Sequence, residues 1–147
     1  MRSISIKMGL WMLVGFITFF LLMFMMGLGH RIELRVFNGI IHISCLYLAI
    51  KSYRELHPET VGDPISGVAQ GVMASLIGIL GFTLFMTIFL SVDTNLMAEI
   101  RKGSPVAIYL EPFTVSLFIL AEGIVISVIG SYILTRILDM KISRVEH

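Results

Sequence analysis

The sequence feature that most constrains the fold is the segment 65–92, which contains no Asp, Glu, Lys or Arg. A soluble helix of this length would carry a charged face toward water, and this segment has none. An α-helix needs about 20 apolar residues to cross the hydrocarbon core of a bilayer, and a longer one crosses at a tilt. We therefore predict a transmembrane helix at 65–92.

Three further segments, 8–28, 36–53 and 112–138, are long and apolar enough to span a bilayer, although polar residues interrupt the second and the fourth. The composition agrees, with 56% hydrophobic residues, 14% charged residues and a mean hydropathy of +0.92. Soluble domains carry about 25% charged residues. We predict an all-α integral membrane protein, a single domain that forms an antiparallel bundle of four transmembrane helices.

The N-terminal segment resembles the start of a secretory signal peptide, because Arg2 and Lys7 precede the first apolar segment. The apolar stretch of a signal peptide runs for about 7–15 residues and is followed by an Ala-x-Ala site. Here the apolar stretch continues to Leu28 without such a site. We expect an uncleaved first transmembrane helix.

The distribution of Lys and Arg predicts the orientation. The two terminal segments and the loop between the second and third spans together hold seven of them, and the other two loops hold four. Cytoplasmic loops carry the excess of positive charge. We therefore predict that both termini are cytoplasmic.

Polar and small residues follow one face of the second predicted helix. Helical spacings of three and four connect Arg35, Asn38, His42, Cys45, Ala49 and Ser52. Exposure of a polar side chain to hydrocarbon costs several kcal/mol of free energy. We therefore expect this face to turn toward the other helices.

Small residues recur at the same spacing in the next two spans. They are Gly67, Gly71, Ala74, Gly78 and Gly81 in the third span, and Gly123, Ser127 and Gly130 in the fourth. Such stripes allow two helix backbones to approach closely. We predict helix packing along both, within the chain or in a homodimer; the alternative is a broken or flexible helix around a binding site.

Glu122 lies near the middle of the fourth span. A charge at that depth costs about 2.5–3.5 kcal/mol, so Glu122 should be protonated, paired or hydrated. His42 is expected at a similar depth on a helix of the same direction, and we hypothesise a hydrogen bond or ion pair between the two. Polar residues that could support this pair are Asn38, Arg35, Glu111 and Arg136. The alternative is a neutral Glu122, bonded to a backbone carbonyl or a serine, that serves assembly only.

Other chemistry finds little support in the sequence. No catalytic motif and no His, Cys, Asp or Glu cluster with metal-ligand spacing is present, and His42 has no second haem ligand at matching depth. We expect no catalytic residue, no metal and no cofactor. The net charge of +1 argues against a nucleic-acid partner, and the single cysteine, Cys45, excludes an intrachain disulfide.

A charged loop after the second span is followed by Ile65-Ser66-Gly67-x-Ala69-x-Gly71, which opens the long third span. In this motif and in its layout the chain resembles a family of uncharacterised bacterial four-span membrane proteins, domain of unknown function 4199. The resemblance implies a multi-pass protein of the bacterial inner membrane. It implies no activity.

Two functions follow as expectations. The first is a non-catalytic scaffold, assembly factor or accessory subunit that works in the lipid bilayer with other membrane subunits or as a homo-oligomer. The second is a small oligomeric transporter or channel subunit that uses Glu122 and His42 to carry protons or ions. A membrane enzyme ranks third because acid–base residues are few and scattered. A Glu122 that faces a water-filled cavity or a symmetry axis would favour transport, and a Glu122 sealed against a neighbouring helix would oppose it.

Overall fold

The computed structural model describes residues 2–29, 36–102 and 109–145, with side chains in the last range as far as residue 142. Within these ranges the protein is helical and has no strand. The elements are α1 (Arg2–Met25), α2 (Val36–Leu56), the short 3-10 helix η2 (Pro58–Thr60), α3 (Pro64–Val92), α4 (Thr94–Lys102) and α5 (Pro112–Val145).

Four of these helices, α1, α2, α3 and α5, are long and apolar enough to cross a membrane. The predicted all-helical fold, with four helices of membrane-spanning length, is thereby confirmed. The helices differ from the predicted spans at their ends: α1 already begins at Arg2, and α2 continues to Leu56. The backbone hydrogen-bond ladder of a helix extends past the apolar segment wherever the next residues also favour the helix.

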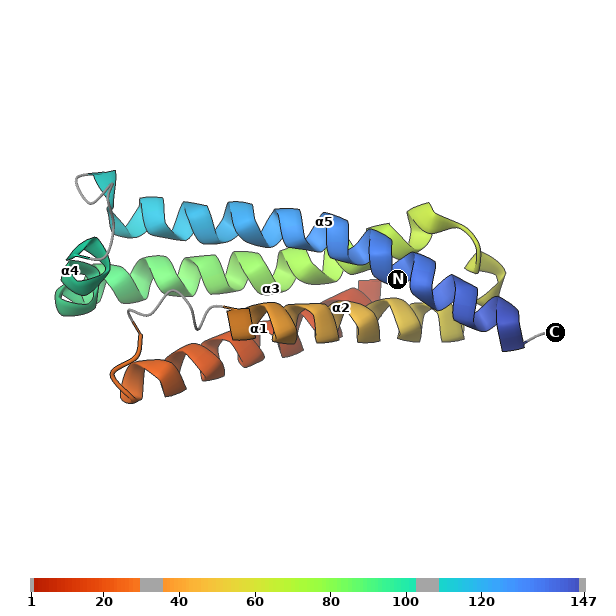
Figure 1. Cartoon of the computed structure of the whole chain (residues 1–147), viewed down its shortest axis with the longest axis horizontal. Coiled ribbons are helices and arrows are strands. Elements are labelled where there is room, and N and C mark those ends of the chain that lie inside the picture. The colour runs from red at the N-terminus through yellow and green to blue at the C-terminus, as the bar shows by residue number, and fades with distance from the viewer. Residues whose placement is uncertain (1, 30–35, 103–108, 146–147) are drawn as a thin grey trace.

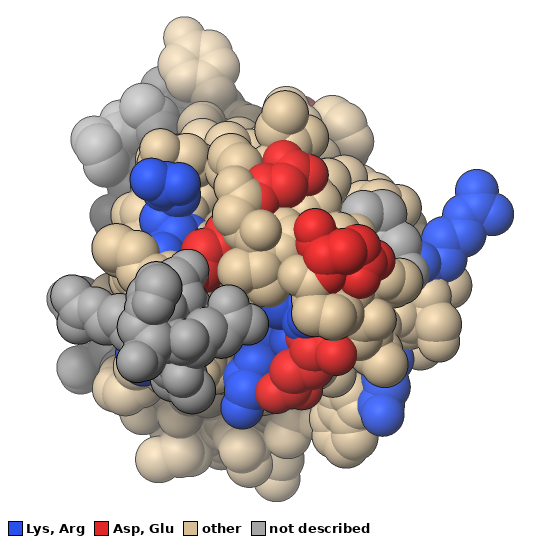
Figure 2. Space-filling model, turned by 90° about the vertical axis from the view of Figure 1, so that its right-hand side faces the viewer, with Lys and Arg blue, Asp and Glu red and all other residues tan. Residues whose placement is uncertain are grey.

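The long helices run alternately up and down and lie side by side (Figure 1). Helix α3 packs against the other three, and α2 lies between α1 and α5. α1 begins, and α5 ends, toward the end of the bundle where α2 is joined to α3 (Figure 1). Lys, Arg, Asp and Glu side chains gather on that end (Figure 2).

The opposite end of the bundle is crossed by α4 (Figure 1). The Asp93 side chain caps this helix, because its Oδ1 accepts a hydrogen bond from the Leu96 N–H at 2.9 Å. Leu96 and Met97 are buried against an aromatic core that includes Phe20 and Phe82.

Glycines of α3 contact α5 in the first turns of α3. A Cβ on Gly67 would lie 2.7 Å from Thr135 Oγ1, and a Cβ on Gly71 would lie 2.9 Å from Ser131 Cβ. Both distances are below ordinary van der Waals contact, so no larger residue fits without displacement of α5. Ala74, the next member of the stripe, is also fully buried.

Later in α3 the small residues face α1 instead. A Cβ on Gly78 would lie 2.9 Å from Met12 Sδ, and one on Gly81 would lie 2.8 Å from Leu13 Cδ2. Gly9 of α1 makes the reverse contact, since its Cβ would lie 2.6 Å from the backbone oxygen of Ala74. The stripe on α3 therefore crosses from one neighbour to the other as the helices cross.

The small residues of α5 meet two different helices. A Cβ on Gly123 would lie 2.9 Å from Ile79 Cδ1 of α3, and one on Gly130 would lie 3.0 Å from Ile43 Cδ1 of α2. Intramolecular packing thus occupies both predicted stripes.

Candidate functional site

A cavity of about 680 Å³ lies among the four long helices and is mostly apolar. Aromatic side chains form much of its wall, with Phe16 and Phe20 from α1 and Phe82 from α3. α2 contributes its first turns, from Val36 to His42. The cavity thus belongs to the half of the bundle where α2 begins.

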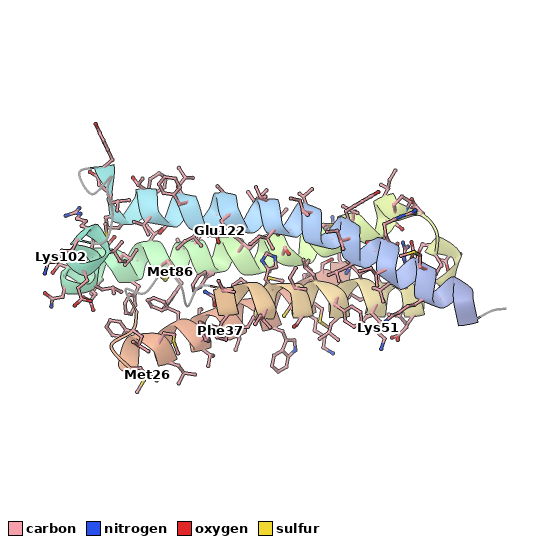
Figure 3. The ribbon with its side chains drawn as sticks, viewed as in Figure 1. Met26, Phe37, Lys51, Met86, Lys102 and Glu122 are labelled. Carbon is pink, nitrogen blue, oxygen red and sulfur yellow. The ribbon has the colours of Figure 1, made fainter. Side chains whose placement is uncertain are left out.

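Among the described lining residues, three polar side chains interrupt the apolar wall: Asn38 and His42 from α2, and Glu122 from α5. Figure 3 shows Glu122 on α5, with Met86 of the cavity wall on the neighbouring α3. The sequence had singled out all three polar residues, and the fold brings them to one cavity.

The described residues of the cavity lining differ in exposure. Val36 of α2 and Glu122 of α5 are exposed, whereas the other described lining residues are buried or half-buried.

His42 lies deep in the cavity wall, with 3% of its surface exposed. Its Nε2 is 2.9 Å from Ser75 Oγ and 3.1 Å from Ser127 Oγ. The Ser127 hydroxyl donates its own proton to the carbonyl oxygen of Gly123 at 2.6 Å. The ring of His42 thus links α2 to α3 through Ser75 and to α5 through Ser127.

Asn38 has a different status, because its Oδ1 is buried without a hydrogen-bond partner. An unsatisfied buried acceptor is uncommon in proteins, and it costs about 1–3 kcal/mol. Glu122 lines the same cavity, but the hydrogen bonds of His42 described above run to Ser75 and Ser127. The Glu122–His42 pair stays a prediction.

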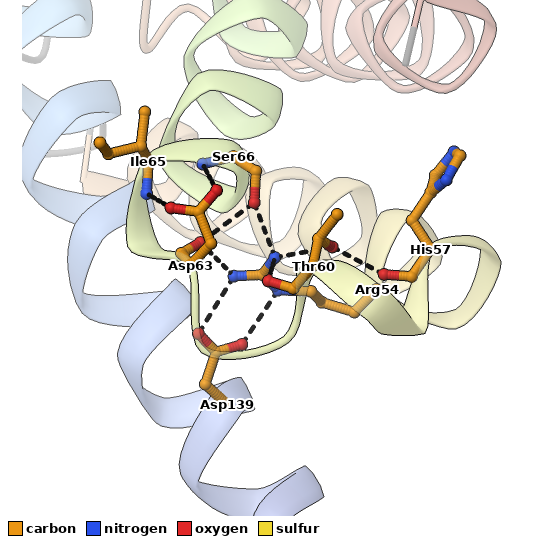
Figure 4. Close-up of polar contacts among 7 residues, drawn as sticks. All are labelled: Arg54, His57, Thr60, Asp63, Ile65, Ser66 and Asp139. Carbon is orange, nitrogen blue, oxygen red and sulfur yellow. Dashed lines mark hydrogen bonds and ion pairs between the residues drawn. The ribbon is translucent and has the colours of Figure 1, made fainter.

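The second polar centre lies at the opposite end of α2, around Arg54 (Figure 4). The guanidinium group forms a two-pronged ion pair with Asp139 of α5, with Nε to Oδ1 at 2.9 Å and Nη2 to Oδ2 at 3.0 Å. Nη2 also donates to the Asp63 carbonyl oxygen at 2.8 Å. Nη1 donates to Thr60 Oγ1 and to Ser66 Oγ, both at 2.9 Å. Every N–H of the guanidinium group therefore has an acceptor.

This arrangement joins three parts of the chain. Arg54 is in α2, its acceptors Thr60 and Asp63 are in the loop before α3, and Asp139 is in the last turns of α5. The Arg54 side chain is fully buried, and 8% of the Asp139 side chain is exposed. Asp63 also caps α3, because its carboxylate accepts from the Ile65 N–H at 3.0 Å.

The sequence did not predict this centre, because the second span was predicted to end at residue 53. That boundary is wrong: α2 continues to Leu56 and buries Arg54. A basic residue at the end of an apolar segment ordinarily marks the membrane surface, so hydropathy gave no reason to pair it. The one available signal was Asp139, an acid between Leu138 and Met140 directly after the fourth predicted span.

The remaining predicted site residues are dispersed. Glu111 lies just before α5 and Arg136 lies within it. Both are exposed, and neither lines the cavity. Arg35 lies outside the described residues. Among the residues that the structure describes, no three His, Cys, Asp or Glu side chains are close enough to hold a metal ion.

No protein-family model, no curated protein and no solved structure matches the chain. The resemblance to domain of unknown function 4199 accordingly stays a prediction. Function must therefore be argued from the side chains themselves.

Proposed function

We propose that this chain, whose four apolar helices are compatible with a multi-pass membrane protein, is a non-catalytic scaffold, assembly factor or accessory subunit of a membrane complex. The observation that carries the proposal is how the buried polar groups are used. Arg54 and Asp139 bind each other, and His42 Nε2 is bonded to two serines of neighbouring helices. These groups hold helices together.

Close packing outside the cavity supports the same proposal. Glycine contacts bring α3 against α5 at Gly67 and Gly71 and against α1 at Gly78 and Gly81. Close-packed side chains resist deformation, because they interdigitate with little free volume. Such contacts suit a protein that presents a fixed surface to other subunits.

The competing proposal is a proton- or ion-coupled subunit, and the cavity beside Glu122 favours it. A conducting chain also needs a route to the other side of the membrane. Beyond the cavity, α3 and α5 are in contact at Gly71 and Ser131, and the Arg54–Asp139 pair fills the interior further along. The single chain thus offers a cavity on one half of the bundle, and a route through it would need another subunit.

We further propose a bacterial inner-membrane location with both termini in the cytoplasm. The support is the excess of Lys and Arg in the terminal segments and the loop between α2 and α3. A C-terminal fusion to a phosphatase that is active only outside the cytoplasm should be inactive. An active fusion would reverse the orientation.

A flux measurement separates the two functional proposals. Protein in liposomes loaded with a pH-sensitive dye, under a valinomycin-imposed potassium potential, is expected to pass protons no faster than empty liposomes. Glu122→Gln, which keeps the size of the side chain and removes its charge, should leave that rate unchanged. After gentle extraction from its native membrane, the chain should migrate in a complex of fixed stoichiometry with other subunits.

The transporter proposal would replace ours if the wild-type protein accelerated proton flux and Glu122→Gln abolished the acceleration. Lys51→Met is a matched control for reconstitution, because Lys51 is exposed and far from the cavity lining. Extraction of the chain without any accompanying subunit, as monomer or homo-oligomer, would contradict the accessory role.

A further inference from the structure

Exposed basic side chains surround the end of the bundle where α2 is joined to α3. Lys7 of α1, Lys51 of α2 and Arg136 of α5 are all exposed. Each lies within three turns of the helix terminus at that end (Figure 1). Lys and Arg side chains project from the margin of this end (Figure 2). Positive charge therefore faces the surroundings of the bundle on three of the four long helices.

An aromatic side chain accompanies each of these charges. Trp11, Tyr47 and Tyr132 are each four residues from the basic residue of the same helix, so the two members of each pair share one helix face. The basic residue comes first in α1, which begins at this end, and the aromatic residue comes first in α2 and α5, which end here. This reversal places the aromatic ring one turn deeper in the bundle than the charge on every one of the three helices.

Such an arrangement is typical of the boundary between a bilayer and water. Trp and Tyr are enriched at the level of the lipid headgroups, and basic side chains near helix ends extend outward to the interface. Trp11 is 64% exposed and Tyr132 is 54% exposed. These two rings lie outside the packed core and are available to lipid.

The three charges differ in whether an acid already neutralises them. Lys51 lies 3.7 Å from Glu55 in a surface pair. Lys7 and Arg136 form no ion pair with another residue that the structure describes. Basic side chains next to a membrane surface attract negatively charged headgroups. Lys7 and Arg136 are therefore the two positions at which an anionic headgroup would be held most strongly.

We propose that this end of the bundle binds anionic phospholipids, with the phosphate groups of two lipids against Lys7 and Arg136 and their glycerol regions beside Trp11 and Tyr132. This lipid-binding surface goes beyond the accessory role proposed above, and it requires only that the four long helices lie in a bilayer. The chain can bind anionic lipid with or without other subunits, so the two proposals fail separately.

Trp11 reports on its own site, because the chain has a single tryptophan. Bromine atoms on a lipid quench the fluorescence of a tryptophan that the lipid contacts. The full chain is reconstituted in vesicles of equal parts phosphatidylglycerol and phosphatidylcholine, with bromine on the acyl chains of one lipid or of the other. Brominated phosphatidylglycerol is expected to quench more strongly, with an about fivefold preference for the anionic lipid from the one basic residue beside the ring.

Lys7→Gln removes the charge and should make the two brominated lipids quench equally. Lys102→Gln is the matched control, because Lys102 is exposed but belongs to α4 at the opposite end of the bundle. This control should keep the preference of the wild-type protein. Equal quenching of the wild-type protein by both lipids, quenching by neither, or a preference that survives in Lys7→Gln would overturn the proposal.

The second site is measured with the reporter moved. Trp11→Phe combined with Tyr132→Trp places the single tryptophan four residues from Arg136, and the same preference is expected there. Addition of Arg136→Gln should abolish it, and an unchanged preference would overturn this site. If the reporter variant does not fold, native mass spectrometry decides. Arg136→Gln should retain fewer phosphatidylglycerol molecules than wild type after partial delipidation, and equal numbers would overturn the site.

Discussion

Replacement of Arg54 by methionine is expected to lower the free energy of unfolding by about 3–5 kcal/mol, the cost of removing one partner of a buried ion pair. Methionine keeps most of the volume but leaves the Asp139 carboxylate and the loop acceptors of Thr60 and Asp63 without the guanidinium group. The loss is measurable by dodecyl sulfate titration in mixed micelles, with helicity as the signal.

Lys51→Met is the matched control, one turn earlier on the same helix. The Lys51 side chain is 49% exposed and lies 3.7 Å from Glu55 in a surface pair. Such pairs contribute about 0–1 kcal/mol, so this variant should unfold almost like wild type. If Arg54→Met cost no more than Lys51→Met, the buried pair would have no structural role.

Two further variants separate charge from geometry. Arg54→Lys keeps the charge but has no planar fork, so an intermediate loss is expected. The double variant Arg54→Met with Asp139→Leu removes both charges and should recover much of the stability lost in Arg54→Met, since a buried pair is often replaceable by apolar residues. Losses that simply add would show that the two residues are not coupled.

Gly71→Ala is expected to destabilise the bundle by about 1–3 kcal/mol, although alanine is the better helix former. The added Cβ would lie 2.9 Å from Ser131 Cβ and 3.2 Å from Ile50 Cδ1. Ser131 Cβ is fixed to its backbone, so rotation of the side chain cannot relieve the overlap and α5 must move away from α3.

Gly39→Ala makes the same chemical change but is expected to stabilise the bundle. No atom lies within 4 Å of its added Cβ, so only the helix propensity changes and a gain of about 0.5–1 kcal/mol is expected. The two variants are compared by the same dodecyl sulfate titration. A Gly71→Ala protein as stable as wild type would mean that α3 and α5 do not depend on their close approach.

The sequence by itself determined the four spans, because a chain in hydrocarbon must satisfy its backbone internally and only long apolar helices can do so. It also indicated which face of α3 packs, because small residues at helical spacing allow two helix backbones to approach closely. The buried face of α2 is close to the predicted face but is rotated around the helix axis. His42 and Ala49 are buried as expected, whereas Asn38 and Cys45 are only half-buried, and Leu46 and Ile50 complete the buried face.

Only the tertiary structure decided which groups meet. Arg54 and Asp139 are 85 residues apart, as are His42 and Ser127. Their contact depends on the rotation and axial shift of each helix. All packing contacts together set these two quantities, and no local sequence pattern encodes them. The same shifts decide that α2, the shortest of the four at 21 residues, leaves a cavity beside its first turns. The sequence therefore predicted four helices of membrane-spanning length, and the packing decided which of their polar residues meet.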